Sequence, residues 1–337
     1  MRRMAIAAIL LFAVFGAAWS IVSDKTLSHL EVIGKTDTPS FKDVPSMAGA
    51  EGEGISEPGV PITVVFGGDM MFDRYIRTAM GRHGRGYPLA PIRDLIGAAD
   101  CAIANLEGPI TKSASISETS AFGSRENYVF TFPEESASAL TESGFDAVSL
   151  GNNHILNFKE EGVRSTEEIL AHAGVGYFGS PLLGEERSLI WDIRGIRVAF
   201  VNYNQFVFRG EERAFEDLAA VRPKADVVVA YAHWGREYEP ALPEMKELAH
   251  RFIDAGADAV IGSHPHIVQE KEGYAGKMIY YSLGNLVFDQ YFREDTMRGL
   301  LVRMTIDPVT KALSYEDIPV VLKRTGETML AAEGVSK

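Results

Sequence analysis

The chain has little of what builds covalent cross-links or a basic surface. Its 337 residues include a single cysteine, Cys101, so no internal disulfide forms and no zinc site made of several thiolates is available. Lysine and arginine total 33 against 46 aspartates and glutamates, and the formal net charge is −13. Nucleic acids and anionic membranes bind basic surfaces, so the composition argues against both as partners.

Long apolar runs are also scarce, except at the N-terminus. Arg2 and Arg3 precede an uncharged stretch from Met4 to Val22, which as a helix would rise roughly 28 Å, about one hydrocarbon core. Residues 1–23 are therefore predicted to be an N-terminal membrane anchor or a cleaved signal peptide, and the small residues at 16–18 keep the second alternative open. Both alternatives place the remaining chain in the cell envelope, anchored outside the cytoplasm or secreted or periplasmic.

The remaining chain divides into a linker, one large domain and a tail. Residues 24–60 are polar and rich in glycine and proline, which is typical of a flexible linker. Strand-like and helix-like segments then alternate, and they predict a domain over 61–325 followed by a tail at 326–337. Helices are expected at 72–80, 88–100, 133–144, 159–174 and 243–256, a strand over 277–285, and a hairpin around 308–311. This order predicts an α/β fold with mixed sheets in two layers covered by helices.

What the chain does contain is a set of short apolar runs that end in residues able to bind a metal or move a proton. The six ends are Asp69, Glu107, Asn153 with His154, His233 with Glu237, His264 with His266, and Asn285. Buried parallel strands read as near-continuous apolar runs, and ligands collect outside their carboxyl ends. We therefore expect one polar centre at a sheet edge, as in a metal-dependent hydrolase or a relative of one.

The Gly-Ser-His-Pro-His segment is the most specific of these ends. Pro265 fixes its own φ and favours an extended His264, so both imidazoles are expected to reach one ion or two neighbouring ions. Two surface histidines in a loop would give the same pattern. His233 alone would more often be a satisfied core residue, whereas Asp69 at the end of a buried strand needs a partner or a metal.

The combination of ligand types indicates which ions fit. Imidazole with carboxylate and amide oxygen suits Mn²⁺, Fe or Zn²⁺ better than Ca²⁺ or copper. We expect one or two divalent ions, and two ions about 3.5–4 Å apart would stabilise both the attacking and the leaving oxygen of a displacement. His154 is placed beside Asn153 to protonate a leaving oxygen.

The same segments carry a family resemblance. Over residues 62–307 the chain contains, in order, GGDMMFDR, NLEGPIT, SLGNNHILNF, HWGREYEP, GSHPHIVQ and YSLGNLVFDQ. With these segments it resembles the CapA/PgsA-type capsule-synthesis proteins, a branch of the calcineurin-like metallophosphoesterase superfamily. The resemblance implies a four-layer αββα sandwich of mixed sheets with a metal site at the strand ends. It also implies a role in capsule or poly-γ-glutamate production at the bacterial cell surface.

The resemblance also implies roles for individual residues. The implied metal ligands are Asp69, Glu107 as the bridging carboxylate, Asn153, His233, His264 and His266; the implied catalytic acid is His154; and the supporting residues are Glu237, Asn285 and Asn157.

Three positions depart from the family pattern. Met71 replaces a histidine ligand, Ile155 replaces an acidic neighbour of the catalytic histidine, and Asn157 replaces an aspartate that many CapA-like chains carry. A neutral Asn157 can orient His154 but cannot stabilise its protonated form as a carboxylate would.

Two functions remain open from the sequence. One is an exported metallohydrolase that acts on a phosphoester or related linkage. The other is a non-catalytic subunit that assists synthesis or export of an anionic surface polymer, or handles its precursor, together with other membrane subunits of a capsule synthesis complex. A carbohydrate hydrolase with Asp69 and Glu107 as its paired carboxylates would leave the histidines unexplained. Arginines 74, 77, 82, 85 and 125 would supply a basic groove for such a polymer, or form an ordinary solvated surface.

Overall fold

The computed structural model describes residues 59–182 and 187–332. The predicted anchor or signal peptide at 1–23, the linker up to residue 58 and the last five residues of the tail lie outside these ranges. Within the described ranges, none of the helices has the length and apolar character needed to span a bilayer.

The larger sheet has eight strands, with the run that leads to Asp69 at its centre. Its order is β14-β13-β12-β1-β2-β3-β4, and β11 also pairs with β1. The bounds are β1 Ile62–Met70, β2 Cys101–Leu106, β3 Ala147–Ser149, β4 Gly176–Phe178, β11 Asn285–Val287, β12 Arg298–Ile306, β13 Leu313–Leu322 and β14 Thr328–Leu330. Strands β1 to β4 run parallel and β12 to β14 pair antiparallel, so the sheet is mixed.

The smaller sheet has six strands in the order β5-β6-β7-β8-β10-β9. The bounds are β5 Ser188–Ile193, β6 Ile196–Asn204, β7 Val227–His233, β8 Ala259–Ser263, β9 Lys271–Tyr274 and β10 Lys277–Tyr280. Its four inner strands run parallel, and an antiparallel strand closes each edge. The central strands β7 and β8 are buried along their whole length, as expected of a parallel sheet covered on both faces.

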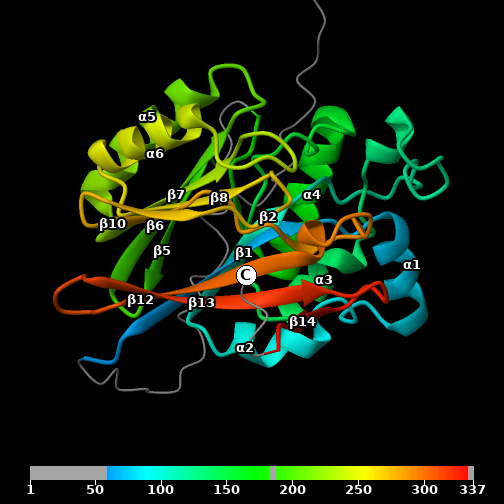
Figure 1. Ribbon diagram of the computed structural model, residues 1–337, viewed down its shortest axis with the longest axis horizontal. Coiled ribbons are helices and arrows are strands. Elements are labelled where there is room, and N and C mark those ends of the chain that lie inside the picture. Colours follow the sequence, from blue (N-terminus) through cyan, green and yellow to red (C-terminus); the bar gives the residue numbers. More distant parts are fainter. Residues whose placement is uncertain (1–58, 183–186, 333–337) are drawn as a thin grey trace, which may run out of the picture. The chain divides into compact units, whose positions relative to one another are not determined.

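Helices cover the two sheets from outside (Figure 1). Their bounds are α1 Arg74–His83, α2 Arg93–Gly97, α3 Glu135–Glu142, α4 Lys159–Ala173, α5 Gly210–Val221 and α6 Pro243–Asp254. Helices α5 and α6 share an apolar cluster with the six-stranded sheet, while α4 contacts β4 of the other sheet and packs against α3. The predicted α/β sandwich of two mixed sheets covered by helices is therefore confirmed.

Aromatic rings fill the space between the sheets. Phe200 on β6 lies with its ring centroid 6.2 Å from that of Phe66 on β1 and 6.0 Å from that of Phe178 on β4. Polar contacts also cross the interface. The Tyr231 hydroxyl on β7 donates a hydrogen bond to the carbonyl oxygen of Gly67 on β1 at 2.6 Å, and Asn202 Nδ2 on β6 donates to Ser149 Oγ on β3 at 3.0 Å.

The structure differs from three of the sequence predictions. The single strand expected over 277–285 divides into β10 and β11, which belong to different sheets. Gly68 permits the approach of the second piece, since a Cβ there would lie 1.9 Å from the carbonyl oxygen of Gly284. The helix expected over 88–100 shortens to α2 after a 3₁₀ turn that contains Pro91. The sheet also continues past residue 325, because β14 pairs with β13 within the stretch assigned to the tail.

Candidate metal centre

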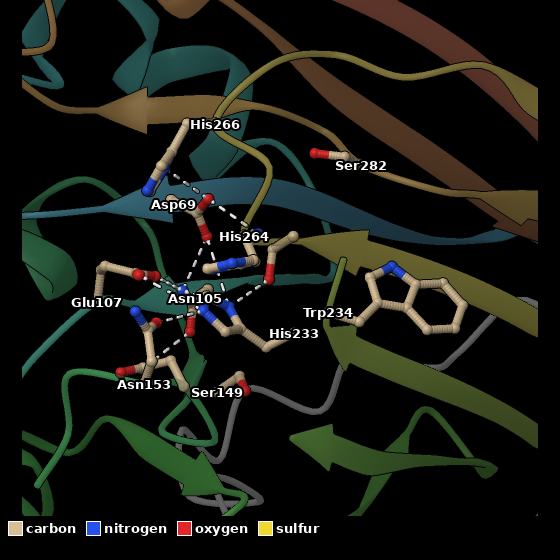
Figure 2. A network of polar contacts seen from close by, with 12 residues as sticks. Asp69, Asn105, Glu107, Ser149, Asn153, His233, Trp234, His264, His266 and Ser282 are labelled. Carbon is tan, nitrogen blue, oxygen red and sulfur yellow. Dashed lines mark hydrogen bonds and ion pairs between the residues drawn. The ribbon is translucent and has the colours of Figure 1, made fainter. Parts of the chain in front are cut away.

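Six of the predicted residues meet where the two sheets end. The eight-stranded sheet contributes oxygen atoms, from Asp69 on β1, Glu107 directly after β2 and Asn153 after β3. The six-stranded sheet contributes imidazoles, from His233 at the end of β7 and from His264 and His266 after β8. Figure 2 shows these side chains turned toward one another. The centre is shielded from solvent, since Asp69, Glu107 and His233 are completely buried.

Glu107, His233 and His264 form the tightest group. One donor atom from each lies within 4.8 Å of the other two. The Nε2 atom of His233 is 3.5 Å from Glu107 Oε1 and 2.8 Å from Asn153 Oδ1. Ligand atoms about 2.0–2.2 Å from one ion lie no more than about 4.4 Å apart, so inward shifts of a few tenths of an ångström would close the group around an ion.

Two atoms of this group have no hydrogen-bond partner. They are Glu107 Oε1 and His264 Nδ1, and both are buried. An unpaired buried polar atom costs about 1–3 kcal/mol, and a shared cation would remove that cost for both. Carboxylate, imidazole and amide donors are a ligand set for Mn²⁺, Fe or Zn²⁺, so the residues present fit a divalent ion.

Asp69 and His266 form a second, differently bonded group. Oδ2 of Asp69 lies 3.2 Å from His266 Nδ1 and accepts the backbone N–H of His264 at 3.1 Å. Its Oδ1 accepts a hydrogen bond from Asn105 Nδ2 at 2.8 Å. Asn285 also contacts His266, and its Oδ1 lies 3.0 Å from the same Nδ1. Both oxygens of Asp69 are therefore already bonded to protein donors.

The electrostatics of the two groups differ accordingly. Burial alone would lower the pKa of His266, but its hydrogen bond and ion pair with Asp69 raise that pKa to about 9. Burial alone would raise the pKa of Asp69, and His266 outweighs it and holds the pKa below the usual range. By contrast, burial and then the charge of Asp69 raise the pKa of Glu107 well above normal. Burial lowers the pKa of His233 to about 4 and that of His264 to about 2, so both rings are neutral at pH 7.

Asn105 is a central residue that the sequence prediction missed. Its Nδ2 donates to both Asp69 and Glu107, and its Oδ1 accepts from Asn152 Nδ2 at 3.1 Å. An available signal was its position, because an asparagine two residues before Glu107 in an apolar strand faces the same side of the sheet. Ser263 was missed as well, and its Oγ lies 2.9 Å from His233 Nδ1 and orients that ring.

His154 is held beside the centre by Asn157. Asn157 Oδ1 accepts the backbone N–H of Phe130 at 2.8 Å and lies 3.2 Å from His154 Nδ1. Because that oxygen only accepts, His154 carries its proton on Nδ1 and leaves a lone pair on Nε2. Burial lowers the pKa of His154 to about 3, so the ring is neutral at pH 7.

Two predicted features do not join the bonded groups of the centre. Glu237 is exposed to solvent, and its negative charge helps to raise the pKa of His233 and His266. Of the five arginines considered for a basic groove, Arg74, Arg77 and Arg85 are ion-paired, with Asp289, Asp73 and Glu142.

The backbone of the His-Pro-His segment differs from its predicted form. His264 was expected to be extended, but its φ is +96°, and His266 also has a positive φ of +58°. Hydrogen bonds from the His264 N–H to Asp69 and from the Tyr238 N–H to Pro265 hold this turn. Non-glycine residues with positive φ are strained and occur preferentially at functional sites. The ring centroids of His264 and His266 are 6.0 Å apart.

Comparison with known proteins gives one family. The family model described as Bacterial capsule synthesis protein PGA_cap matches residues 63–290, more than half of the chain. Capsule biosynthesis protein CapA of Bacillus anthracis is 28% identical over 253 residues, which cover 68% of this chain and 60% of that protein. PGA biosynthesis protein CapA of Bacillus subtilis (strain 168) is 26% identical over 249 residues, with 68% and 64% covered. The chain thus spans less than two thirds of the length of these two relatives.

Two further similarities cover a larger share of the protein that is matched. A probable polyglutamine synthesis accessory protein of Mycobacterium tuberculosis (strain CDC 1551 / Oshkosh) is 27% identical, covering 78% of this chain and 85% of that protein. Among solved structures, a hypothetical protein from Thermus thermophilus has a TM-score of 0.48 and 20% identity, covering 77% of this chain and 99% of the other.

Proposed function

This chain belongs to the bacterial capsule synthesis protein family PGA_cap, and on that premise we propose that it is a metal-dependent hydrolase of capsule or poly-glutamate biosynthesis. Its substrate in this proposal contains a phosphoester or a related linkage. The relatives named for capsule and PGA biosynthesis support the biological setting. We propose the cell envelope as its location, with residues 1–23 as anchor or cleaved signal peptide.

The observation that carries the proposal is the buried group of Glu107, His233 and His264. It combines donor atoms within 4.8 Å of one another with two buried atoms that have no protein partner. Glu107, His233 and His264 would hold the ion, with Asn153 Oδ1 adjacent to His233 as a fourth donor. When bound, a divalent ion supplies Lewis-acid polarisation of a phosphoryl or acyl oxygen.

Asn157 and His154 would then position and transfer a proton. Asn157 fixes the His154 ring with its proton on Nδ1, so Nε2 is the atom that exchanges a proton with substrate or water. An anionic substrate beside the ring stabilises the imidazolium form and raises the pKa of His154 above its resting value of about 3. The protonated ring can then donate to a leaving oxygen.

A non-catalytic subunit is the second candidate, and specific observations favour it. Met71 supplies no ligand, because its sulfur accepts the backbone N–H of Asp73 at 3.0 Å. Asn157 is neutral, so His154 lacks a carboxylate partner. In this alternative the chain keeps the fold and assists synthesis or export of an anionic surface polymer with other membrane subunits. Ion pairing of Arg74, Arg77 and Arg85 leaves less free positive charge for such a polymer.

Metal analysis combined with a substrate panel separates the two candidates. We expect the purified protein to retain a divalent ion and to hydrolyse a member of a phosphomonoester and phosphodiester panel. His154→Ala should keep the ion and lose about 10²- to 10⁴-fold in kcat/KM. His172→Ala is the matched control, since His172 is exposed on α4 and its Nδ1 lies 2.7 Å from the carbonyl oxygen of Glu168 in the same helix. Folded protein without metal and without turnover would establish the non-catalytic role instead.

A further inference from the structure

We propose that Phe206 selects the substrate at the candidate metal centre, by packing against a flat apolar ring in the organic group next to the phosphoester. The inference rests on the proposed hydrolase function and deepens it, because it names the class of group that the substrate presents. Phe206 belongs to the loop of residues 205–209 that joins β6 to α5.

The Phe206 ring lies directly against the centre. Its centroid is 4.6 Å from that of the His264 ring and 5.9 Å from that of the His233 ring. His233 is completely buried and His264 is 4% exposed, yet Phe206 is 44% exposed. The phenyl ring therefore contacts the imidazoles and keeps apolar surface free for a ligand.

Phe206 also marks the side from which solvent comes nearest to the candidate ligands. Asn153, whose Oδ1 is 2.8 Å from His233 Nε2, is partly exposed, whereas Asp69 and Glu107 are completely buried. Asn153 and Phe206 are thus neighbours of the same imidazole, and both reach the surface. A substrate that approaches the centre from this side meets the Phe206 ring.

The loop holds Phe206 in a defined place. The Phe206 N–H donates to Asn204 Oδ1 at 2.9 Å, and the Gln205 N–H donates to the carbonyl oxygen of His233 at 3.1 Å. The Gln205 side chain bonds the Gly235 backbone twice, since its Oε1 accepts the N–H at 2.8 Å and its Nε2 donates to the carbonyl oxygen at 3.3 Å. Because this backbone is already ordered, a ligand that packs against the ring has less conformational entropy to overcome.

A second pair of aromatic rings lies at the other end of the His-Pro-His turn. The Tyr238 ring centroid is 6.2 Å from that of His266 and 5.6 Å from that of Phe292, which is 50% exposed. The Tyr238 N–H donates to the carbonyl oxygen of Pro265 at 2.9 Å, so this ring is tied to the same turn. Aromatic rings pack favourably against other flat apolar rings, whereas a carboxylate placed against them loses hydration without gaining a partner.

Phosphonates test the inference without turnover, because they have a carbon–phosphorus bond in place of the phosphoester. The full chain, loaded with Mn²⁺ or Zn²⁺, is titrated with phenylphosphonate and with methylphosphonate by isothermal titration calorimetry. We expect phenylphosphonate to bind about 10-fold more tightly. Equal affinities would overturn the inference and leave the proposed hydrolase intact. Binding of neither compound would reject the proposed function, and this inference with it.

Variants assign the preference to the Phe206 ring. We expect Phe206→Ala to keep its metal and to bind the two phosphonates with similar affinity, whereas Phe206→Tyr retains the preference of about 10-fold. Phe208→Ala is the matched control and should also retain it, since Phe208 belongs to the same loop and is 83% exposed. Circular dichroism and metal analysis accompany each titration. A preference that survives Phe206→Ala would overturn the inference. Loss of metal from a folded Phe206→Ala protein would overturn it too, by assigning the ring a shielding role.

Discussion

The two sheets contribute different chemistry to the same centre. The eight-stranded sheet supplies oxygen atoms from Asp69, Glu107 and Asn153, and the six-stranded sheet supplies the three imidazoles. Away from the centre the same two sheets meet through phenylalanine rings. Neither sheet alone carries a complete ligand set, so the centre is a product of sheet packing. A bound cation would therefore act as a cross-link between the sheets.

The largest predicted effect comes from breaking the apolar part of this interface. Phe200 is completely buried between Phe66 and Phe178, and Phe200→Ala should lower the free energy of unfolding by about 3–5 kcal/mol. Urea denaturation followed by circular dichroism measures the change. The control Phe122→Ala removes a ring that is 80% exposed and should change stability by less than about 0.5 kcal/mol. Equal losses in both variants would refute the assignment of the sheet interface as the main core.

Metal binding at the polar part of the interface should change the free energy of unfolding by about as much as Phe200→Ala, in the stabilising direction. At a free ion concentration about 1,000 times Kd, binding to the folded state alone adds about 4 kcal/mol to the free energy of unfolding. We expect a corresponding rise in Tm with Mn²⁺ or Zn²⁺, absent in His264→Ala and kept in His172→Ala. A rise that survives His264→Ala would place the ion elsewhere.

In the metal-free protein, lowering the pH should decrease the free energy of unfolding through the three histidines whose pKa values are lowered by burial. The pKa values of His154, His233 and His264 are lowered to about 3, 4 and 2, so their contribution to stability is present above pH 6.5 and is lost as pH falls below it. Each net proton taken up on unfolding costs about 1.4 kcal/mol per pH unit. Glu107 opposes this trend, because its raised pKa keeps a proton on the folded state.

The Asp69–His266 pair should respond at the other end of the pH scale. The pKa of His266 is raised to about 9, so its stabilisation is complete below pH 6.5 and disappears as pH rises through 9. Denaturation midpoints measured from pH 4 to 10 should therefore decline on both sides. A His266→Gln protein should lose the alkaline decline and keep the acidic one; an unchanged alkaline limb would disprove the ion pair.

The smallest predicted effect comes from one of the polar links across the sheets. Tyr231→Phe removes the hydroxyl that donates to the Gly67 carbonyl at 2.6 Å and leaves the ring in place. We expect a loss of about 1–2 kcal/mol, less than for Phe200→Ala, measured by the same urea titration. A loss as large as that of Phe200→Ala would mean that polar links rather than apolar packing hold the sheets together.

The sequence predicted the strands and their polar ends better than the connections between sheets. Apolar runs ending in Asp69, Glu107 and His233 identify buried strands, and the carboxyl ends of parallel strands necessarily share an edge. The division of 277–285 into β10 and β11 was not predictable, because an apolar sequence does not indicate which of two sheets its residues join. Helix α5 was not anticipated either.

Within the centre, the residue types were predictable and their bonding was not. Asp69 and Glu107 look alike in sequence, as carboxylates that follow apolar strands. Their difference arises from neighbours far along the chain, since His266 and Asn105 occupy the oxygens of Asp69 while Glu107 Oε1 has no partner. Such a distinction depends on three-dimensional contacts, which no local pattern encodes.

The strained backbone at His264 and His266 is a stability cost of placing two imidazoles at the centre. A left-handed conformation costs an ordinary residue about 1–2 kcal/mol that glycine does not lose, and both histidines adopt it, with φ of +96° and +58°. Glycine at position 264 or 266 would relieve this backbone cost, but it would also leave a cavity, and at position 266 it would remove the contact with Asp69.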